Sequence, residues 1–199
     1  MTPRLAQAVA TLRAGGVVAI PTDTVYGLAV DPSVPGATDD LFAFKSRPQA
    51  LDLPVLVGTI EQAEALAGPA GLPLVARCLA GVFWPGALTI VVPRRRGLDW
   101  VLGAHAGTIG LRVPDHPVAR ALCDEVGALA TTSANVHGEE PCTDANAVRR
   151  AFGPGVVVVD DGVCTGSPST VVDVVDGTPR CLREGAVPWA EVVAALGID

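Results

Sequence analysis

Residues 17–28 read VVAIPTDTVYGL and join a short apolar run to a segment rich in hydroxyl groups. The run from Val17 to Ile20 has the length and branching of a buried strand, which Pro21 ends. Because open α/β sheets bind ligands just past the ends of their strands, we expect a ligand-binding loop here, with Thr24 and Tyr26 as candidates. A polar turn without a ligand is the alternative interpretation of the same residues.

Apolar periodicity and capping residues continue this pattern along the chain. Helices are expected over residues 5–12, 38–45, 59–66, 72–80, 117–126 and 144–152, and strands over residues 17–20, 55–57, 88–92, 108–113, 129–132, 156–159 and 170–175. Strands that alternate with helices of this length predict an α/β fold with a mixed sheet. Glycine and proline are spread through the loops, so we expect a single domain over residues 1–199.

Composition narrows the class of protein. Hydrophobic residues make up 49% and charged residues 18%, which allows a large core and excludes a disordered chain. The formal net charge of -7 argues against a general nucleic-acid binder, whose surface should be basic. The five cysteines lack the spacing of a disulfide framework or a zinc site, as in a protein of the reducing cytoplasm. We also expect no signal peptide and no membrane span, and therefore a cytoplasmic protein.

Lys45 is the only lysine in the chain and stands two residues before Arg47. We expect residues 38–40 to cap a helix that ends at Lys45, where a cation complements the helix dipole. The segment before Pro48 should be extended, which would hold both cations in a fixed turn suited to a carboxylate or a phosphate. Lys45 and Arg47 are therefore candidate catalytic residues, and stabilisation of the helix end is the alternative.

Arg112 lies within the apolar run at residues 108–113. An arginine there is costly unless it is paired or faces a ligand cavity, so it is a candidate binding residue. Ser133 and Asn135 are small polar residues at the end of the expected strand 129–132, Ser169 directly precedes the strand at 170–175, and Arg183 ends the strand after it.

Several common chemistries have no motif in this sequence. There is no G-x-x-x-x-G-K-[ST] phosphate-binding loop, no G-x-G-x-x-G fingerprint, and no metal-ligand spacing among the three histidines. The run Arg94-Arg95-Arg96 is the one candidate nucleic-acid patch, with a solvated turn as its alternative.

Six segments in this order resemble the threonylcarbamoyl-AMP synthase (YrdC-like) family. They are PTDTVYGL at 21–28, KSR at 45–47, WPGALT at 84–89, GLRVP at 110–114, SAN at 133–135 and STVVD at 169–173. The resemblance covers nearly the whole chain. It implies one catalytic domain with a concave central cavity in a twisted mixed sheet flanked by helices.

The resemblance also implies an activity. Members of the family form L-threonylcarbamoyladenylate from L-threonine, bicarbonate and ATP, with Mg²⁺ entering on the ATP phosphates and pyrophosphate leaving. The product feeds N6-threonylcarbamoyladenosine at position 37 of tRNA through separate transferase proteins, so tRNA and these proteins are the expected macromolecular partners. A carbamate oxygen of threonine attacks the α-phosphorus of ATP, so the protein needs no nucleophile and instead aligns reactants and neutralises charge.

The family's site residues carry over to matching positions of this chain. L-Threonine would be held by Thr24, Tyr26, Arg112 and Ser169. The nucleotide would contact Arg47, Thr108, Ser133, Asn135, Thr143 and Arg183. Lys45, with Arg47, would supply positive charge between the two ligands.

The chain departs from the family pattern at three places. Leu51-Asp52 stands where relatives often carry a polar or basic residue and proline, Pro168 where glutamate is common, and Glu184 where proline is common. Two other interpretations therefore stay open: an RNA-binding module of the same fold, and a divergent nucleotide-binding paralogue with a different acyl or amino substrate. The segment 48–54 is a candidate lid.

Overall fold

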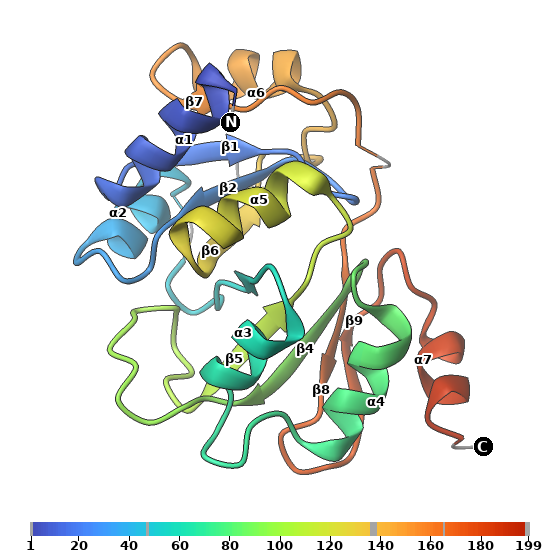
Figure 1. The fold of residues 1–199 in the computed structure, drawn as a ribbon. Helices are drawn as coiled ribbons and strands as arrows, with labels where there is room; N and C mark the ends of the chain where they lie inside the picture. Colours follow the sequence, from blue (N-terminus) through green and yellow to red (C-terminus); the bar gives the residue numbers. More distant parts are fainter. Residues whose placement is uncertain (1, 47, 136–138, 165, 198–199) are drawn as a thin grey trace.

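The computed structural model describes residues 2–46, 48–135, 139–164 and 166–197, which form nine strands of one sheet and seven helices (Figure 1). The strands are β1 (Val18–Ile20), β2 (Gly27–Val30), β3 (Val55–Leu56), β4 (Leu88–Pro93), β5 (Thr108–Arg112), β6 (Leu129–Ser133), β7 (Val157–Val158), β8 (Thr170–Asp173) and β9 (Arg180–Arg183). The helices are α1 (Pro3–Arg13), α2 (Ala37–Phe44), α3 (Ile60–Leu66), α4 (Leu74–Phe83), α5 (Pro117–Val126), α6 (Ala145–Phe152) and α7 (Trp189–Ala195).

The sheet is mixed, in the order β7-β1-β2-β6-β3-β5-β4-β8-β9. The pairs β1–β7, β3–β5 and β4–β8 are parallel, and the other neighbouring pairs are antiparallel. This arrangement confirms the predicted α/β fold with a mixed sheet. The short strand β3 joins two halves of the sheet, because Val55 pairs with Ala130 of β6 on one side and with Leu111 of β5 on the other.

Helices cover both halves of the sheet. Figure 1 shows α1, α2, α5 and α6 around the half that contains β1, β2, β6 and β7, and α3, α4 and α7 around the other half. Helix α1 packs against α5, and α4 packs against α7. Strands β1, β2 and β3 are fully buried, which matches their continuous apolar runs, whereas the edge strand β9 is exposed. Among the described residues, no helix combines the length and the hydropathy needed to cross a bilayer.

Local sequence explains where most helices begin. The Thr59 hydroxyl accepts a hydrogen bond from the backbone N–H of Gln62 at the start of α3, as the capping-box spacing predicts. The Asp144 carboxylate caps α6 by accepting from the backbone N–H of Ala147 at 2.8 Å, again as predicted. These caps satisfy N–H groups that the first turn of a helix leaves unpaired.

The predicted cap of α2 is wrong. The helix begins after Gly36, which is in the left-handed conformation, and no side chain caps it; residues 38–40 lie inside the first turn. The segment after this helix is also not extended where it is described, because Lys45 is in the right-handed helical region and Ser46 has a φ of 49°. Glycine supplies the positive φ that the loop before α2 requires.

Strand β2 and helix α7 were not predicted. Residues 27–30 contain Gly27 and Ala29, which have weak strand propensity, and the strand forms because β1 and β6 pair with it on both sides. Helix α7 has only seven residues, too few for a clear apolar period, and it buries Val192 against the rest of the core.

Candidate active site

Two adjoining cavities lie along the sheet and share the residues Pro54, Thr89 and Arg183. The smaller cavity has a volume of about 240 Å³, and the larger one a volume of about 520 Å³. Hydroxyl groups and an arginine line the smaller cavity, chiefly Thr22, Thr24, Arg112, Thr132, Ser133 and Ser169. The larger cavity has mostly apolar walls, with the side chains of Val91, Leu102, Ile109, Val175 and Leu182. We call the shared region at Pro54, Thr89 and Arg183 the neck.

Arg112, at the end of β5, is the central cation of the smaller cavity. Its Nη1 donates to the Thr24 hydroxyl at 3.0 Å, its Nη2 to the Asp23 carboxylate at 2.6 Å, and its Nε to the Gly86 carbonyl at 2.8 Å. Its side chain is only 6% exposed, and this burial lowers the pKa of the guanidinium, while the charge of Asp23 opposes the shift. A guanidinium has five N–H donors, so Arg112 keeps donors for an anionic ligand after these three contacts.

The loop after β1 is folded by its own hydroxyl groups. The Thr22 hydroxyl donates to the Val25 carbonyl at 2.7 Å and accepts from the backbone N–H groups of Thr24 and Val25 at 3.2 Å. This local turn brings the Thr24 side chain to Arg112. The polar turn that the sequence allows as an alternative therefore forms, and the same turn places Thr22 and Thr24 on the wall of the smaller cavity.

Lys45 organises the other side of the smaller cavity. Its ammonium lies within 3.1 Å of four acceptors, namely Thr132 Oγ1, the carbonyl and the hydroxyl of Ser133, and Asn135 Oδ1. The Ser133 hydroxyl in turn donates to Asn135 Oδ1 at 2.6 Å. Because Thr132 and Ser133 line the cavity that holds Arg112, the two predicted cations contact the walls of one cavity.

Ser169 and Arg183 form a third polar group at the neck. Arg183 Nη2 donates to the Ser169 carbonyl at 2.7 Å and to the Ser169 hydroxyl at 3.2 Å. The Ser169 hydroxyl also lies 3.0 Å from the hydroxyl of Thr89. Although β9 is exposed as a whole, loss of water around this guanidinium, and then the nearby charge of Arg112, lower the pKa of Arg183.

Residues 50–54 and Thr108 line the larger cavity. Asp52 accepts a hydrogen bond from the backbone N–H of His105 at 3.2 Å, and its other carboxylate oxygen lies 2.7 Å from His105 Nδ1. The backbone N–H of Leu53 donates to the Leu102 carbonyl at 2.7 Å. Asp52, one of the departures from the family pattern, thus attaches this segment to the loop before β5.

Glu184, a second departure, has a local structural role. Its carboxylate accepts a hydrogen bond at 3.0 Å from the backbone N–H of Trp189, the first residue of α7. The substitution therefore stabilises the start of a helix that lies outside the two cavities.

Most of the predicted site residues come together around the two cavities. Six of them line a cavity, namely Thr24, Thr108, Arg112, Ser133, Ser169 and Arg183. Lys45 and Asn135 contact Ser133 directly. Arg47 lies outside the described residues.

Tyr26 and Thr143, two further predicted site residues, line neither of the two cavities. Tyr26 is fully buried and its hydroxyl donates to the Gly162 carbonyl at 2.9 Å, so its ring lines neither cavity. Burial raises the pKa of this phenol. Thr143 also lines neither cavity, and its carbonyl accepts from the backbone N–H of Cys164. The backbone of Tyr26 still borders the site, because its N–H donates to the Cys142 carbonyl and its carbonyl accepts from the N–H of Ala134.

Three residues at the site were missed as individual candidates. Asp23 pairs with Arg112, Gly86 supplies a carbonyl to the same guanidinium, and Thr89 stands at the neck. All three lie within the segments 21–28 and 84–89 that carry the resemblance. Arg112 in an apolar run requires a partner, so a search for the missing carboxylate could have found Asp23.

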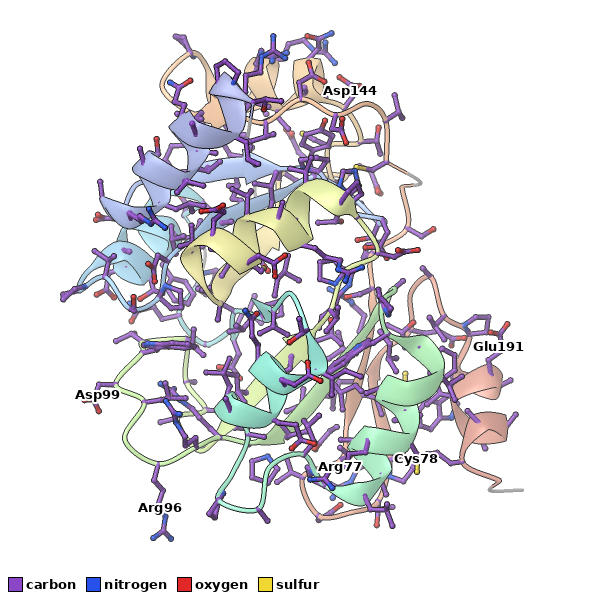
Figure 2. The ribbon with its side chains drawn as sticks, in the orientation of Figure 1. Arg77, Cys78, Arg96, Asp99, Asp144 and Glu191 are labelled. Carbon is purple, nitrogen blue, oxygen red and sulfur yellow. The ribbon has the colours of Figure 1, made fainter. Side chains whose placement is uncertain are left out.

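The arginine run at 94–96 is not a continuous surface patch. Arg94 is buried, and its Nη2 donates to the carbonyls of Leu98 and Trp100. Arg95 and Arg96 are exposed, and Figure 2 shows Arg96 projecting away from the body of the molecule. Arg94 holds the loop after β4 together through these carbonyl groups. Its guanidinium is therefore not part of an exposed basic patch that could bind nucleic acid at residues 94–96.

Comparisons with known proteins agree with this geometry. A family model described as "Telomere recombination" (Sua5_yciO_yrdC) matches residues 10–185. A chain from Mycobacterium tuberculosis (strain ATCC 25618 / H37Rv) is 41% identical over 197 residues, which cover 98% of this chain and 90% of that one. The threonylcarbamoyl-AMP synthase of Bacillus subtilis (strain 168) is 38% identical over 199 residues, which cover 98% of this chain and 57% of the relative.

The fold is also similar to a solved structure with a ligand. The crystal structure of P. abyssi Sua5 complexed with L-threonine superimposes with a TM-score of 0.90 and 34% identity. The match covers 97% of this chain and 57% of that chain.

Proposed function

This chain belongs to the Sua5/YciO/YrdC family, and on that premise we propose that it is an enzyme that forms L-threonylcarbamoyladenylate from L-threonine, bicarbonate and ATP. The observation that carries the proposal is the pair of cavities that meet at the neck. The smaller one is polar and contains a buried arginine, as an amino-acid carboxylate requires. The larger one is apolar and of the size that holds a nucleotide base and ribose.

L-Threonine would occupy the smaller cavity. The remaining N–H donors of Arg112 would bind its carboxylate, and the hydroxyl groups of Thr24 and Ser169 would orient its polar groups. Because Asp23, Thr24 and Gly86 already hold the guanidinium, binding would require little reorganisation of Arg112. The threonine amine would then point toward the neck, where it meets bicarbonate.

ATP would occupy the larger cavity with its phosphates toward the neck. Thr108 and Arg183 would contact the nucleotide, and Ser133 and Asn135 would contact phosphate oxygens. The ammonium of Lys45, with Arg47, would offset the charge that builds up on the leaving pyrophosphate. Mg²⁺ would arrive on the ATP phosphates as part of the substrate, since magnesium prefers phosphate oxygens and water.

The reaction needs alignment and charge neutralisation, not a nucleophile from the protein. The neutral amine of threonine and bicarbonate combine to a carbamate with loss of water. A carbamate oxygen then attacks the α-phosphorus, and the bond to the bridging oxygen breaks, with its electron pair leaving on pyrophosphate. Holding the reactants in line across a narrow neck supplies most of the rate enhancement that such a transfer requires.

The product would be passed on for modification of tRNA. Threonylcarbamoyladenylate is a mixed anhydride, so a cytoplasmic transferase that modifies position 37 of tRNA would have to accept it before water does. We include tRNA and such transferases among the partners of the pathway, as substrates of the next step.

The direct test is product formation by the purified protein. With ATP, L-threonine and bicarbonate we expect pyrophosphate release and an adenylate that liquid chromatography with mass spectrometry detects. Omitting threonine or bicarbonate should stop pyrophosphate release. Lys45→Ala should abolish it. Arg112→Lys should raise the KM for threonine at least about tenfold, because lysine lacks the planar fork of arginine. The matched control is Arg150→Lys on the exposed face of α6.

Two results would contradict the proposal. One is no adenylate from a folded wild-type protein with all three substrates. The other is equal kcat/KM for serine and threonine, because the extra methyl group should be worth about 1–3 kcal/mol in a fitted cavity. The second result would favour a paralogue with a different amino substrate.

A further inference from the structure

The neck between the two cavities contains one hydroxyl group that the proposed function has not used. Of the three residues that line both cavities, Pro54 offers no side-chain donor and Arg183 holds Ser169. The third is Thr89, a residue that is 2% exposed. A hydroxyl group that lines both cavities lies close to the place where a ligand of one cavity would form a bond to a ligand of the other.

The Thr89 hydroxyl lies at the end of a hydrogen-bonded chain that starts at Arg183. A guanidinium only donates, so the Ser169 hydroxyl accepts from Arg183 and has one proton to give. If it gives that proton to the Thr89 hydroxyl, 3.0 Å away, the proton of Thr89 is directed elsewhere. In this arrangement the Thr89 hydroxyl can donate to a ligand at the neck, and Arg183 polarises the two hydroxyl groups in sequence.

The strands hold Thr89 next to the other polar groups of the site. In the β4–β5 register Ile90 is opposite Leu111, so the next pair along is Thr89 and Arg112. On the same face, a Cβ on Gly110 would lie 3.3 Å from the Thr89 methyl group, so the glycine leaves this side chain its space. The position of Thr89 is thus set by two strands, which is the precision that catalysis requires.

We propose that Thr89 is a catalytic residue that donates a hydrogen bond to the carbamate–phosphate group as the adenylate forms. This inference rests on the proposed function. The carbamate oxygen forms its bond to the α-phosphorus at the neck while the bond to pyrophosphate breaks. The Thr89 proton is shared with an α-phosphoryl oxygen, whose negative charge grows in the transition state, and stays on Thr89 afterwards. Ser169 and Arg183 position this hydroxyl.

Two substitutions separate the contribution of the Thr89 hydroxyl group from the contribution of its side-chain volume. Thr89→Val removes the hydroxyl and keeps the volume, whereas Thr89→Ser keeps the hydroxyl and removes the methyl group. We expect Thr89→Val to lower kcat for pyrophosphate release about 10²-fold, with the KM values for threonine and ATP within about threefold of wild type. Thr89→Ser should keep kcat within about fivefold. Thr89→Ala is the second hydroxyl-free variant, in case valine prevents folding.

The outcomes distinguish this inference from the function on which it rests. If the wild-type protein forms no adenylate, both fall. If it does, and Thr89→Val keeps the wild-type kcat, only the role of Thr89 falls. Equal losses in the valine and serine variants would assign Thr89 to packing, and a rise in KM at constant kcat would assign it to ground-state binding; either result overturns the inference.

Discussion

At the scale of single residues, the site depends on charges that are buried with their partners. Arg112 and Asp23 have side chains only 6% and 15% exposed, and their separation is 2.6 Å. Removal of one partner from such a pair leaves an uncompensated charge, which typically costs about 3–5 kcal/mol. Asp23 also accepts the backbone N–H of Asp115, so it connects the loop after β1 to the segment before α5. The carboxylate thereby sets the orientation of the arginine from outside the cavity lining.

Cys123 gives a prediction for stability against pH. Burial raises the pKa of its thiol from 9.0 to about 12, since α5 places it in the core. Above pH 9 the unfolded chain releases this proton while the folded chain keeps it, so stability falls as pH rises toward 12. One proton corresponds to a slope of at most about 1.4 kcal/mol per pH unit. Urea unfolding between pH 8 and pH 11 measures it.

The control for this prediction is a second cysteine. Cys123→Ala should reduce the fall in the free energy of unfolding at alkaline pH. The lost packing also lowers this free energy, but by the same amount at every pH. Cys78→Ala, which removes an exposed thiol, should leave the slope unchanged. If the free energy of unfolding falls equally steeply with pH in wild type and in Cys123→Ala, this thiol does not cause the loss of stability at alkaline pH.

At the scale of elements, the turn after β9 supports the neck. The pairing of β8 with β9 is irregular at Val171 and Val172, and Gly185, just after β9, packs against Pro168 and Ser169, just before β8. A Cβ at Gly185 would lie 2.3 Å from the Pro168 carbonyl oxygen and 2.7 Å from the Ser169 carbonyl oxygen. Both atoms belong to the backbone, so they cannot move away as a flexible side chain would.

Gly185→Ala should therefore displace the Ser169 carbonyl that Arg183 holds. We expect a loss of about 1–3 kcal/mol in the free energy of unfolding, together with a fall in kcat/KM for adenylate formation. Denaturant unfolding and initial rates measure the two effects. Gly155→Ala is the matched control, because nothing lies within 4 Å of its Cβ position. Wild-type activity in Gly185→Ala would mean that the neck tolerates a shift of this strand.

At the scale of the whole molecule, residues from both halves of the sheet line the smaller cavity. Thr24 belongs to the half with β1 and β2, whereas Arg112 belongs to β5 on the other side of β3. Strand β3 is only two residues long, so side-chain contacts across the cavity add to a narrow backbone connection. A ligand that binds both halves should stabilise the folded chain as a unit.

We therefore expect L-threonine to raise the melting temperature. At a concentration of about 100 times Kd, binding adds about 2.7 kcal/mol, which corresponds to about 5–10 °C for a chain of this size. Differential scanning fluorimetry with L-threonine, and with L-alanine as the comparison ligand, measures the shift. Arg112→Lys should reduce it, since it removes the fork that binds the carboxylate. An equal shift with L-alanine would contradict a fitted threonine site.

The sequence by itself determined most elements and several polar residues of the smaller cavity, among them Thr24, Arg112 and Ser133. Apolar runs and capping residues predicted nearly all the helices and strands, because these signals act over a few residues. The buried Arg112, the hydroxyl groups after β1 and the segments shared with the family predicted the polar cavity. A resemblance of ordered motifs identifies such residues because the family's reaction requires each of them at its place.

Only the tertiary structure decided which of these residues line the smaller cavity, which line the larger one, and which are buried in the core. Strand β2 exists because β1 and β6 pair with it, and no local propensity of residues 27–30 reports that. Tyr26 follows two threonines in the sequence, but its ring is buried in the core and its hydroxyl donates to the Gly162 carbonyl, a residue far along the chain. Thr89 stands at the neck because β4 pairs with β5 and β8 at once. Pairing between strands that are far apart in the sequence sets the positions of these residues, and local sequence patterns carry no information about that pairing.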